Sequence, residues 1–286
     1  MYDSILLPVD EAAVESSLLY HAAELANWDD ASVELLYVAD TSRDSVTVAG
    51  DGKVVDALVQ EGEDVVDEAS GLLDSLGVDY STSVEQGTPA KTIVDYAKQE
   101  RHDLIAMPTH GREGLSRYLL GSVTAKVVRL APMPVLTAPI EEEGFEFPYG
   151  GMLLPTDGSD AALRAARHGL DFAAELDADV HVLTVTDDSL LANVEDALDD
   201  DDETSTQEAV DEVVDAAERR GIEGVTTHVE SGDPDEEILA AVEREGLDAV
   251  VMGATGRHGI DRVLLGSVAE KTIRSADVPV ITVGEN

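Results

Sequence analysis

Short apolar segments alternate with longer amphipathic segments along the whole chain. Residues 4–10 (SILLPVD) and 103–107 (DLIAM) are apolar at consecutive positions, which is typical of strands buried on both faces. Between such runs, apolar residues recur at helical spacing, as at Val14, Leu18 and Ala22. Strands that alternate with helices in this way predict parallel sheets built from right-handed βαβ units. The pattern therefore predicts an α/β fold.

In the first half of the chain, the pattern predicts five strands with helices between them. The strands are expected at residues 4–10, 33–38, 78–85, 103–107 and 134–137. The helices are expected near residues 14–26, 57–76, 89–101 and 121–130, with residues 41–56 as a loop or an irregular helix start. Thr88 and Pro89 predict the start of the third helix, because Thr is a good N-cap and Pro fits the first helical position.

A long segment of the chain occurs twice. Residues 111–137 recur 145 positions later as residues 256–282, and 15 of the 27 aligned residues are identical. A repeat of this size at a fixed period indicates two copies of one domain, and 286 residues suit two domains of about 140 residues each. We expect domains at residues 1–140 and 149–286.

The second half repeats the first in order. Residues 152–157 correspond to the first strand, residues 180–185 to the second, and residues 248–252 to the fourth. The least ordered part is expected at residues 187–205, which include the acidic run Asp199–Glu203. Contiguous acids point in all directions, so a solvated loop is favoured there over the alternative of a metal site.

Each copy carries a glycine-rich segment between a predicted strand and a predicted helix. In the second copy its spacing is Gly253-x2-Gly256-x9-Gly266-Ser267. Glycine lets the backbone turn sharply and approach a ligand without a Cβ in the way. The unpaired amides and the positive dipole end at the start of a helix favour a phosphate. The segment therefore predicts a phosphate site, with a purely structural turn as the alternative.

Basic residues gather in these same segments. Of the 18 lysines and arginines, 8 lie within the 38 residues 111–129 and 256–274, at matching positions in the two copies. Arg257 is the best phosphate candidate because it follows the second glycine. Four of the other matched bases lie further along the helix and are expected to pair with nearby acids: Lys126, Arg129, Lys271 and Arg274.

The pattern Gly-x2-Gly-x9-Gly-Ser, together with Pro-Thr-Asp-Gly-Ser after the first strand, resembles the ATP-binding branch of the universal stress protein family. The resemblance covers both halves of the chain. It implies two tandem doubly wound domains, each with a five-stranded parallel sheet of order 3-2-1-4-5. The nucleotide would lie at the carboxyl ends of strands one and four, the topological switch point of the sheet.

The resemblance also implies roles for particular residues of the second copy. Adenosine would be bordered by Pro155, Thr156 and Asp157, with the Val185 backbone at the adenine edge and Met252 and Gly253 on the ribose side. The phosphates would be held by Gly256, Arg257, Gly266, Ser267 and Val268. For Asp157, a helix N-cap beside Gly158 and Ser159 is an alternative role, and the two roles are compatible.

The first copy departs from the family pattern at two places. Pro108 stands where the second copy has Gly253, and Asp10-Glu11-Ala12 replaces Asp157-Gly158-Ser159. Proline removes an N–H and fixes φ, and the extra carboxylate lies near any bound phosphate. We therefore expect a weakened or nucleotide-free site there. Its residues would be Asp10, Val38, Gly111, Arg112, Gly121, Ser122 and Val123.

The composition limits the partners. Acids outnumber bases 61 to 18, giving a formal charge of −43, and lysine is scarce. This resembles the acidic surfaces of proteins from salt-accumulating halophiles, where high salt screens the self-repulsion. A strongly negative chain also repels nucleic acid and anionic membranes, so both are expected to be poor partners. There is no cysteine, no signal-like leader and no apolar run of about 20 residues, so a cytoplasmic protein is expected.

No catalytic constellation is evident. The seven histidines include no helical pair at metal spacing, and no lysine follows the glycine-rich segment as in a P-loop. The leading hypothesis is an ATP-binding regulatory or stress-response protein, with ADP or AMP as alternative ligands and Mg²⁺ or Mn²⁺ as companions. The alternatives are a scaffold with constitutive or no nucleotide, and a slow ATPase. The resemblance implies that the last strands of the two copies pair in an intrachain pseudo-dimer, and further homodimerisation through another face is expected.

Overall fold

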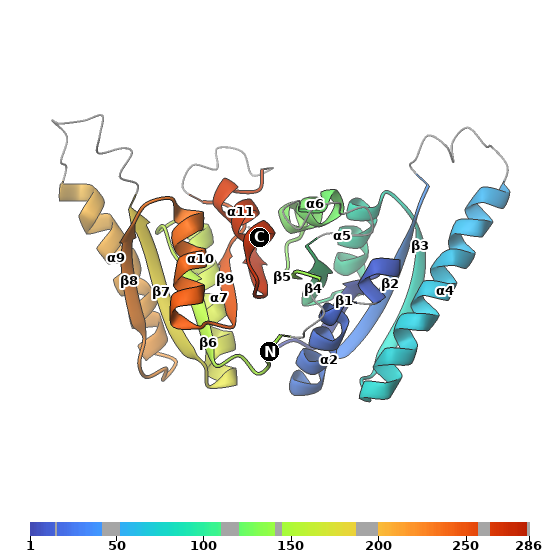
Figure 1. Ribbon diagram of the computed structural model, residues 1–286, viewed down its shortest axis with the longest axis horizontal. Helices are drawn as coiled ribbons and strands as arrows, with labels where there is room; N and C mark the ends of the chain where they lie inside the picture. The colour runs from blue at the N-terminus through green and yellow to red at the C-terminus, as the bar shows by residue number, and fades with distance from the viewer. Residues whose placement is uncertain are drawn as a thin grey trace. The chain divides into compact units, whose positions relative to one another are not determined.

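The computed structural model describes residues 1–14, 16–41, 52–109, 120–140, 145–186, 200–256 and 264–284. The chain divides into two compact units, one of residues 2–147 and one of residues 148–286 together with Met1. Each unit has its own parallel sheet with helices on both faces (Figure 1). This is the α/β fold that the hydrophobic pattern predicts.

The N-terminal unit has the strand order β3-β2-β1-β4-β5. Its parallel strands are β1 (Ser4–Pro8), β2 (Ser32–Asp40), β3 (Tyr80–Gly87), β4 (Leu104–Pro108) and β5 (Val135–Ala138). The described helices are α1 (Glu11–Val14), α2 (Ser17–Asp29), α4 (Gly52–Leu76), α5 (Pro89–Glu100) and α6 (Ser122–Leu130). Helices α2 and α4 pack together on the sheet, as do α5 and α6.

The C-terminal unit repeats this arrangement in the order β8-β7-β6-β9-β10. Its parallel strands are β6 (Gly151–Pro155), β7 (Asp179–Thr186), β8 (Thr226–Ser231), β9 (Ala249–Gly253) and β10 (Val280–Val283). The described helices are α7 (Asp160–Leu176), α9 (Asp200–Glu218), α10 (Pro234–Glu245) and α11 (Ser267–Ser275). Helices α7 and α9 pack together, and so do α10 and α11.

An aspartate at the start of the fourth strand ties it to the first strand in both units. Asp103 Oδ2 accepts hydrogen bonds from the N–H groups of Asp3 at 2.9 Å and Ser4 at 3.1 Å. Asp248 Oδ2 accepts the equivalent bonds from Gly150 at 2.7 Å and Gly151 at 3.0 Å. A carboxylate that accepts backbone N–H bonds forms charge-assisted hydrogen bonds, which are stronger than neutral ones. These bonds fix the two strands at the amino edge of each sheet.

Two helix starts differ from the sequence expectation. Helix α4 begins at Gly52 rather than near residue 57, and α9 begins at Asp200, inside the segment expected as a loop to residue 205. Acidic residues in a first helical turn interact favourably with the helix dipole, so an acidic run is compatible with a helix N-terminus. The buried Val213 and Ala217 further along α9 show which face packs inward. In the described part of the chain, no three His, Asp or Glu side chains form a group that could hold a metal ion.

The helix predicted to begin after Thr88 does begin there, but the Thr88 side chain does not cap it. Thr88 is the N-cap of α5 with Pro89 as the first helical residue, yet its side chain makes no capping hydrogen bond. Asp233 is the equivalent N-cap of α10, also without a side-chain bond. The fixed φ of proline is therefore the feature that both starts share. None of the described helices is both long and apolar enough to cross a membrane.

Gly169 should be intolerant of a side chain, because α7 lies close to the sheet there. A Cβ at Gly169 would overlap the Leu154 side chain and lie 3.1 Å from Val251 Cβ. We expect Gly169→Ala to destabilise the protein by about 1–3 kcal/mol through overpacking. The matched control is Gly71→Ala in α4, where a Cβ meets nothing within 4 Å and alanine should stabilise by up to about 1 kcal/mol. Urea unfolding in molar salt measures both shifts, and equal shifts in one direction would contradict this packing.

His168 on α7 should make stability depend on pH. Burial lowers the pKa of His168 from its usual 6.5 to about 4. The unfolded chain therefore binds a proton that the folded chain resists between about pH 6.5 and pH 4, so stability falls as the pH decreases through this window, by at most about 3 kcal/mol. His168→Gln removes this contribution. The wild-type stability minus the variant stability should fall from pH 7 to about pH 4, whereas parallel profiles would exclude the effect.

Candidate functional site

The chain leaves the carboxyl end of β6 through a tight, hydrogen-bonded turn. The Thr156 N–H donates to the Leu183 carbonyl at 2.8 Å, and Thr156 Oγ1 accepts from the Gly158 N–H at 3.2 Å. Gly158 has a φ of +75°, a left-handed conformation that favours glycine. Thr156 is thus buried and fixed, and the next residue, Asp157, is exposed at the sheet edge.

Ser159, rather than Asp157, is the N-cap of α7. Ser159 Oγ accepts from the Ala162 N–H at 3.2 Å. Asp157 Oδ1 accepts from the Ser159 N–H at 3.0 Å, a local turn that precedes the helix. The alternative that made Asp157 the cap is therefore wrong. Serine is also a preferred N-cap, and Ser159 was the signal available in the sequence.

Two glycines allow the start of α11 and the segment after β9 to lie against the β6 turn. A Cβ on Gly256 would lie 2.9 Å from Asp157 Oδ2, so the two residues approach closely. A Cβ on Gly266 would lie 3.3 Å from the Ala254 carbonyl oxygen and 3.4 Å from Thr255 Cα. The carboxyl ends of β6 and β9 and the first turn of α11 therefore lie close together.

Gly253 has a packing role in addition to the predicted approach to a ligand, which stays a prediction. A Cβ there would lie 3.0 Å from the Ala161 carbonyl carbon and 3.0 Å from the Thr255 carbonyl oxygen. These are atoms of the protein's own backbone, so glycine permits close packing between β9 and the first turn of α7. Neither Gly253 nor Gly256 has a positive φ, so a sharp glycine turn does not explain them.

The first turn of α11 is anchored by a backbone bond and begins at a glycine. The N-cap Gly266 donates its N–H to the Ala254 carbonyl at 2.9 Å, and as a glycine it offers no side chain to the amides of the first turn. The following Ser267 is exposed and Val268 is half-buried. The positive end of the helix dipole is thus presented beside Gly256 and the Asp157 carboxylate. An anion with a bound cation suits this combination.

The remaining predicted residues of the second copy differ in exposure. Pro155 is the last residue of β6, and Val185 is half-buried near the carboxyl end of β7. Met252 is only 5% exposed and lies in β9. Arg257 lies outside the described residues.

The N-terminal unit preserves part of this arrangement. Gly121 donates its N–H to the Thr109 carbonyl at 2.7 Å and is the N-cap of α6, which continues with the exposed Ser122 and the half-buried Val123. Val38 is half-buried in β2. Gly111 and Arg112 lie outside the described residues.

The turn after the first strand is where the two units differ. Asp10 Oδ1 accepts from the Ala13 N–H at 2.9 Å, so Asp10 starts the short helix α1, which is separate from α2. The C-terminal unit has the single helix α7 instead. At Gly253, a side chain would meet the first turn of α7, and the N-terminal unit, which has Pro108 at the equivalent position, has a differently placed helix start. The two sequence departures of the first copy are thus parts of one structural change.

One of the bases expected to pair with acids does so. Lys271 Nζ lies 2.9 Å from Asp235 Oδ1, and this partner raises the pKa of Lys271. Its charge is therefore directed towards α10. The pairing expected of Lys126, Arg129 and Arg274 stays a prediction.

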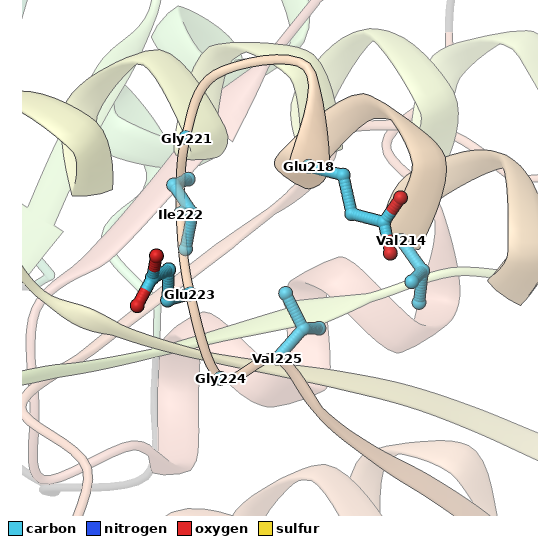
Figure 2. Close-up of a pocket in the computed structure, with 7 residues that line it drawn as sticks. All are labelled: Val214, Glu218, Gly221, Ile222, Glu223, Gly224 and Val225. Atoms are coloured by element: carbon cyan, nitrogen blue, oxygen red, sulfur yellow. The ribbon is translucent and has the colours of Figure 1, made fainter.

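A separate hollow of about 470 Å³ lies at the opposite edge of the C-terminal unit (Figure 2). It is formed by the end of α9 and the segment that leads into β8, and so lies at the amino end of that strand. Its lining consists of Val214, Glu218, Gly221, Ile222, Glu223, Gly224 and Val225. None of the predicted nucleotide residues contributes to it.

The repeated unit matches a known protein family twice. The family described as "Universal stress protein family" matches residues 1–139 and again residues 148–284. The chain belongs to the universal stress protein family. It is a tandem member, because each half matches the family by itself.

Relatives and solved structures agree with this assignment. A universal stress protein of Methanocaldococcus jannaschii, MJ0531, is 37% identical over 139 residues, which is 48% of this chain and 81% of the relative. One from Methanothermobacter thermautotrophicus is 33% identical over 139 residues, 47% of this chain and 94% of the relative. The crystal structure of a universal stress protein from Archaeoglobus fulgidus has a TM-score of 0.77 at 23% identity, covering 99% of this chain and 98% of that one. This last likeness shows that the tandem fold is shared over the whole length.

The glycines of the site should differ in how well they tolerate alanine. At Gly253 the added methyl meets backbone atoms, which cannot rotate away, whereas at Gly256 it meets the end of the Asp157 side chain. We expect Gly253→Ala to destabilise the protein by about 1–3 kcal/mol and Gly256→Ala to cost less than about 1 kcal/mol. Urea unfolding of both variants checks the order, and a Gly253→Ala variant as stable as wild type would contradict the packing described here.

Proposed function

We propose that this universal stress protein binds an adenine nucleotide in its C-terminal unit, at the carboxyl ends of β6 and β9. ATP is the leading ligand, with ADP and AMP as alternatives. The observation that carries the proposal is the first turn of α11, which begins at Gly266 and which the Gly266–Ala254 bond holds beside Gly256 and Asp157. This is the edge at which open α/β sheets bind ligands.

The phosphates are assigned to the start of α11 and the segment before it. Helix amides and the dipole favour negative charge, and the exposed Ser267 hydroxyl is a further donor. Gly256 and Gly266 have no side chain that would occupy the space, and Arg257 follows in sequence. Val268 contributes the next backbone N–H of the turn.

We assign three residues to the adenosine side of the site: Pro155, Thr156 and Asp157. The backbones of Val185, Met252 and Gly253 complete this side.

Asp157 also constrains the companion ion. Its carboxylate approaches Gly256, so a phosphate there would meet a negative charge. A Mg²⁺ or Mn²⁺ ion bound through a carboxylate and phosphate oxygens resolves this repulsion.

The proposed role is regulatory: nucleotide occupancy would bias the conformation or the choice of protein partner. A ligand can do this only by its differential affinity for two states, which small-angle scattering with and without ATP measures. A scaffold that holds its nucleotide constitutively would show no change of shape. Slow ATP hydrolysis is the other alternative. Phosphate release that stays slow with every added cofactor would count against an ATP-dependent enzyme.

The N-terminal unit is proposed to bind nucleotide weakly or not at all. Asp10 starts α1 instead of standing in a turn before a capped helix, and Pro108 replaces the glycine that allows close packing in the other unit. Gly121 and Ser122 remain in place at the start of α6. The two units therefore offer a matched pair of serines for a test.

The stoichiometry of bound nucleotide should be one per chain. We expect Ser267→Ala to weaken ATP binding about 3- to 15-fold, the loss of one hydrogen bond, whereas the equivalent Ser122→Ala leaves it unchanged. The measurement is the nucleotide released on denaturation, followed by calorimetric titration of the stripped protein with ATP and Mg²⁺ in molar salt. Two sites per chain would contradict the asymmetry, and a folded protein that binds no ATP would contradict the function itself.

A further inference from the structure

Two histidines from neighbouring strands of the C-terminal unit meet through their ring nitrogens. His181 lies on β7 and His228 on β8, with His181 Nδ1 2.9 Å from His228 Nε2. The ring centroids are 5.1 Å apart and the ring planes differ by 17°. In the part of the chain that the structure describes, the only hydrogen bond of either ring is the one between them. Both rings are partly exposed, so an ion can reach them from solvent.

The N-terminal unit has no histidine at the equivalent places. The strand registers align His181 with Glu34 and His228 with Ser83. There, Ser83 Oγ donates to Glu34 Oε1 at 2.8 Å, and the Tyr96 hydroxyl of α5 also donates to this carboxylate. Helix α10 has Ala241 at the position of Tyr96 and so supplies no hydroxyl. The two histidines are thus a feature of one copy rather than a requirement of the fold.

Acidic side chains surround the pair. Glu245 and Asp179 raise the pKa of His181 by their charge, against the larger effects of burial and of His228, which together leave this pKa lowered. Glu245 is exposed at the end of α10, where it pairs with Arg244 at 3.0 Å. Glu230 on β8 lies 2.9 Å from the same arginine. The site is therefore two imidazoles within a partly neutralised carboxylate cluster.

We propose that His181 and His228 bind a divalent transition-metal ion of the Zn²⁺ class, with water and the nearby Glu245 as the remaining ligands. Two tetrahedral Zn–N bonds of about 2.0–2.1 Å place the ligand nitrogens about 3.3 Å apart and the ring centroids about 5.2 Å apart. The centroids already have nearly this separation, so the rings need not move apart, but each must turn by about 35° for its nitrogen to face one ion. No third ligand is preformed among the described residues, so Glu245 must leave Arg244 to complete the site.

The chemistry of the donors favours this ion class over the hard cations that an acidic surface attracts. Imidazole nitrogen suits Zn²⁺, Cu²⁺ and Ni²⁺, whereas Mg²⁺ and Ca²⁺ prefer oxygen. Metal binding needs the neutral imidazole, so protons compete with the ion for this site. The pair lies in the amino-terminal half of β7, away from the carboxyl edge proposed for nucleotide. The metal site is therefore independent of the proposed function.

Zinc titration of the nucleotide-free protein tests the proposal. We expect one Zn²⁺ per chain, measured by calorimetry in molar KCl with excess Mg²⁺ to saturate the acidic surface. Affinity should fall at least about tenfold in His181→Gln and in His228→Gln, and also on lowering the pH from about 7.5 to 5.5, because protons compete for imidazole. Ring resonances of both histidines should shift on adding Zn²⁺ in an NMR spectrum.

The control is His102→Gln in the N-terminal unit, where His102 Nδ1 hydrogen-bonds to Ser4 Oγ at 2.8 Å and Zn²⁺ binding should be unchanged. Circular dichroism verifies that each variant is folded. Equal Zn²⁺ affinity in wild type and both histidine variants would assign binding to the acidic surface and overturn the proposal. A folded wild type that binds no Zn²⁺ would overturn it as well.

Discussion

The pairing of the first strand with the fourth is the constraint on which each unit depends. At the amino edge, one aspartate carboxylate accepts two backbone N–H groups from the start of the first strand, and it does so in both units. At the carboxyl edge, the same two strands diverge into separate turns. Because their amino ends are fixed, the turns after β6 and β9 are held at the short distances that bring Asp157 to Gly256.

Close backbone packing at the carboxyl edge then determines what the site can bind. Gly253 allows β9 to approach the first turn of α7, and the Gly266 N–H bond to Ala254 places α11. A glycine N-cap has no side chain with which to satisfy the helix amides, so they face the site. Backbone N–H groups therefore contribute positive polarity beside the Asp157 carboxylate, on a chain whose net charge is −43.

Much of this architecture could be predicted from the sequence. The internal repeat located both units, and the glycine spacing located the segment that joins β9 to α11. The reason for Gly253 could not be predicted, because it depends on a contact with Ala161 about 90 residues away in sequence. The start of α9 at Asp200 could not be predicted, because an acidic run is as compatible with a solvated loop as with a helix N-terminus. The contact between His181 and His228 could not be predicted from spacing within one segment, because it depends on the register of β7 with β8.

The split between α1 and α2 limits how the first domain can change. Pro108 and the separate short helix suit one another, whereas Gly253 and the continuous α7 form the alternative combination. Replacing Pro108 by glycine alone would leave Asp10 bound to the Ala13 N–H, and rebuilding the helix start alone would drive it against the proline ring. Only the second of these changes, made first, meets a clash, so glycine at position 108 has to precede a rebuilt helix start. After duplication of the domain, this required order slows any conversion of the first copy to the form of the second.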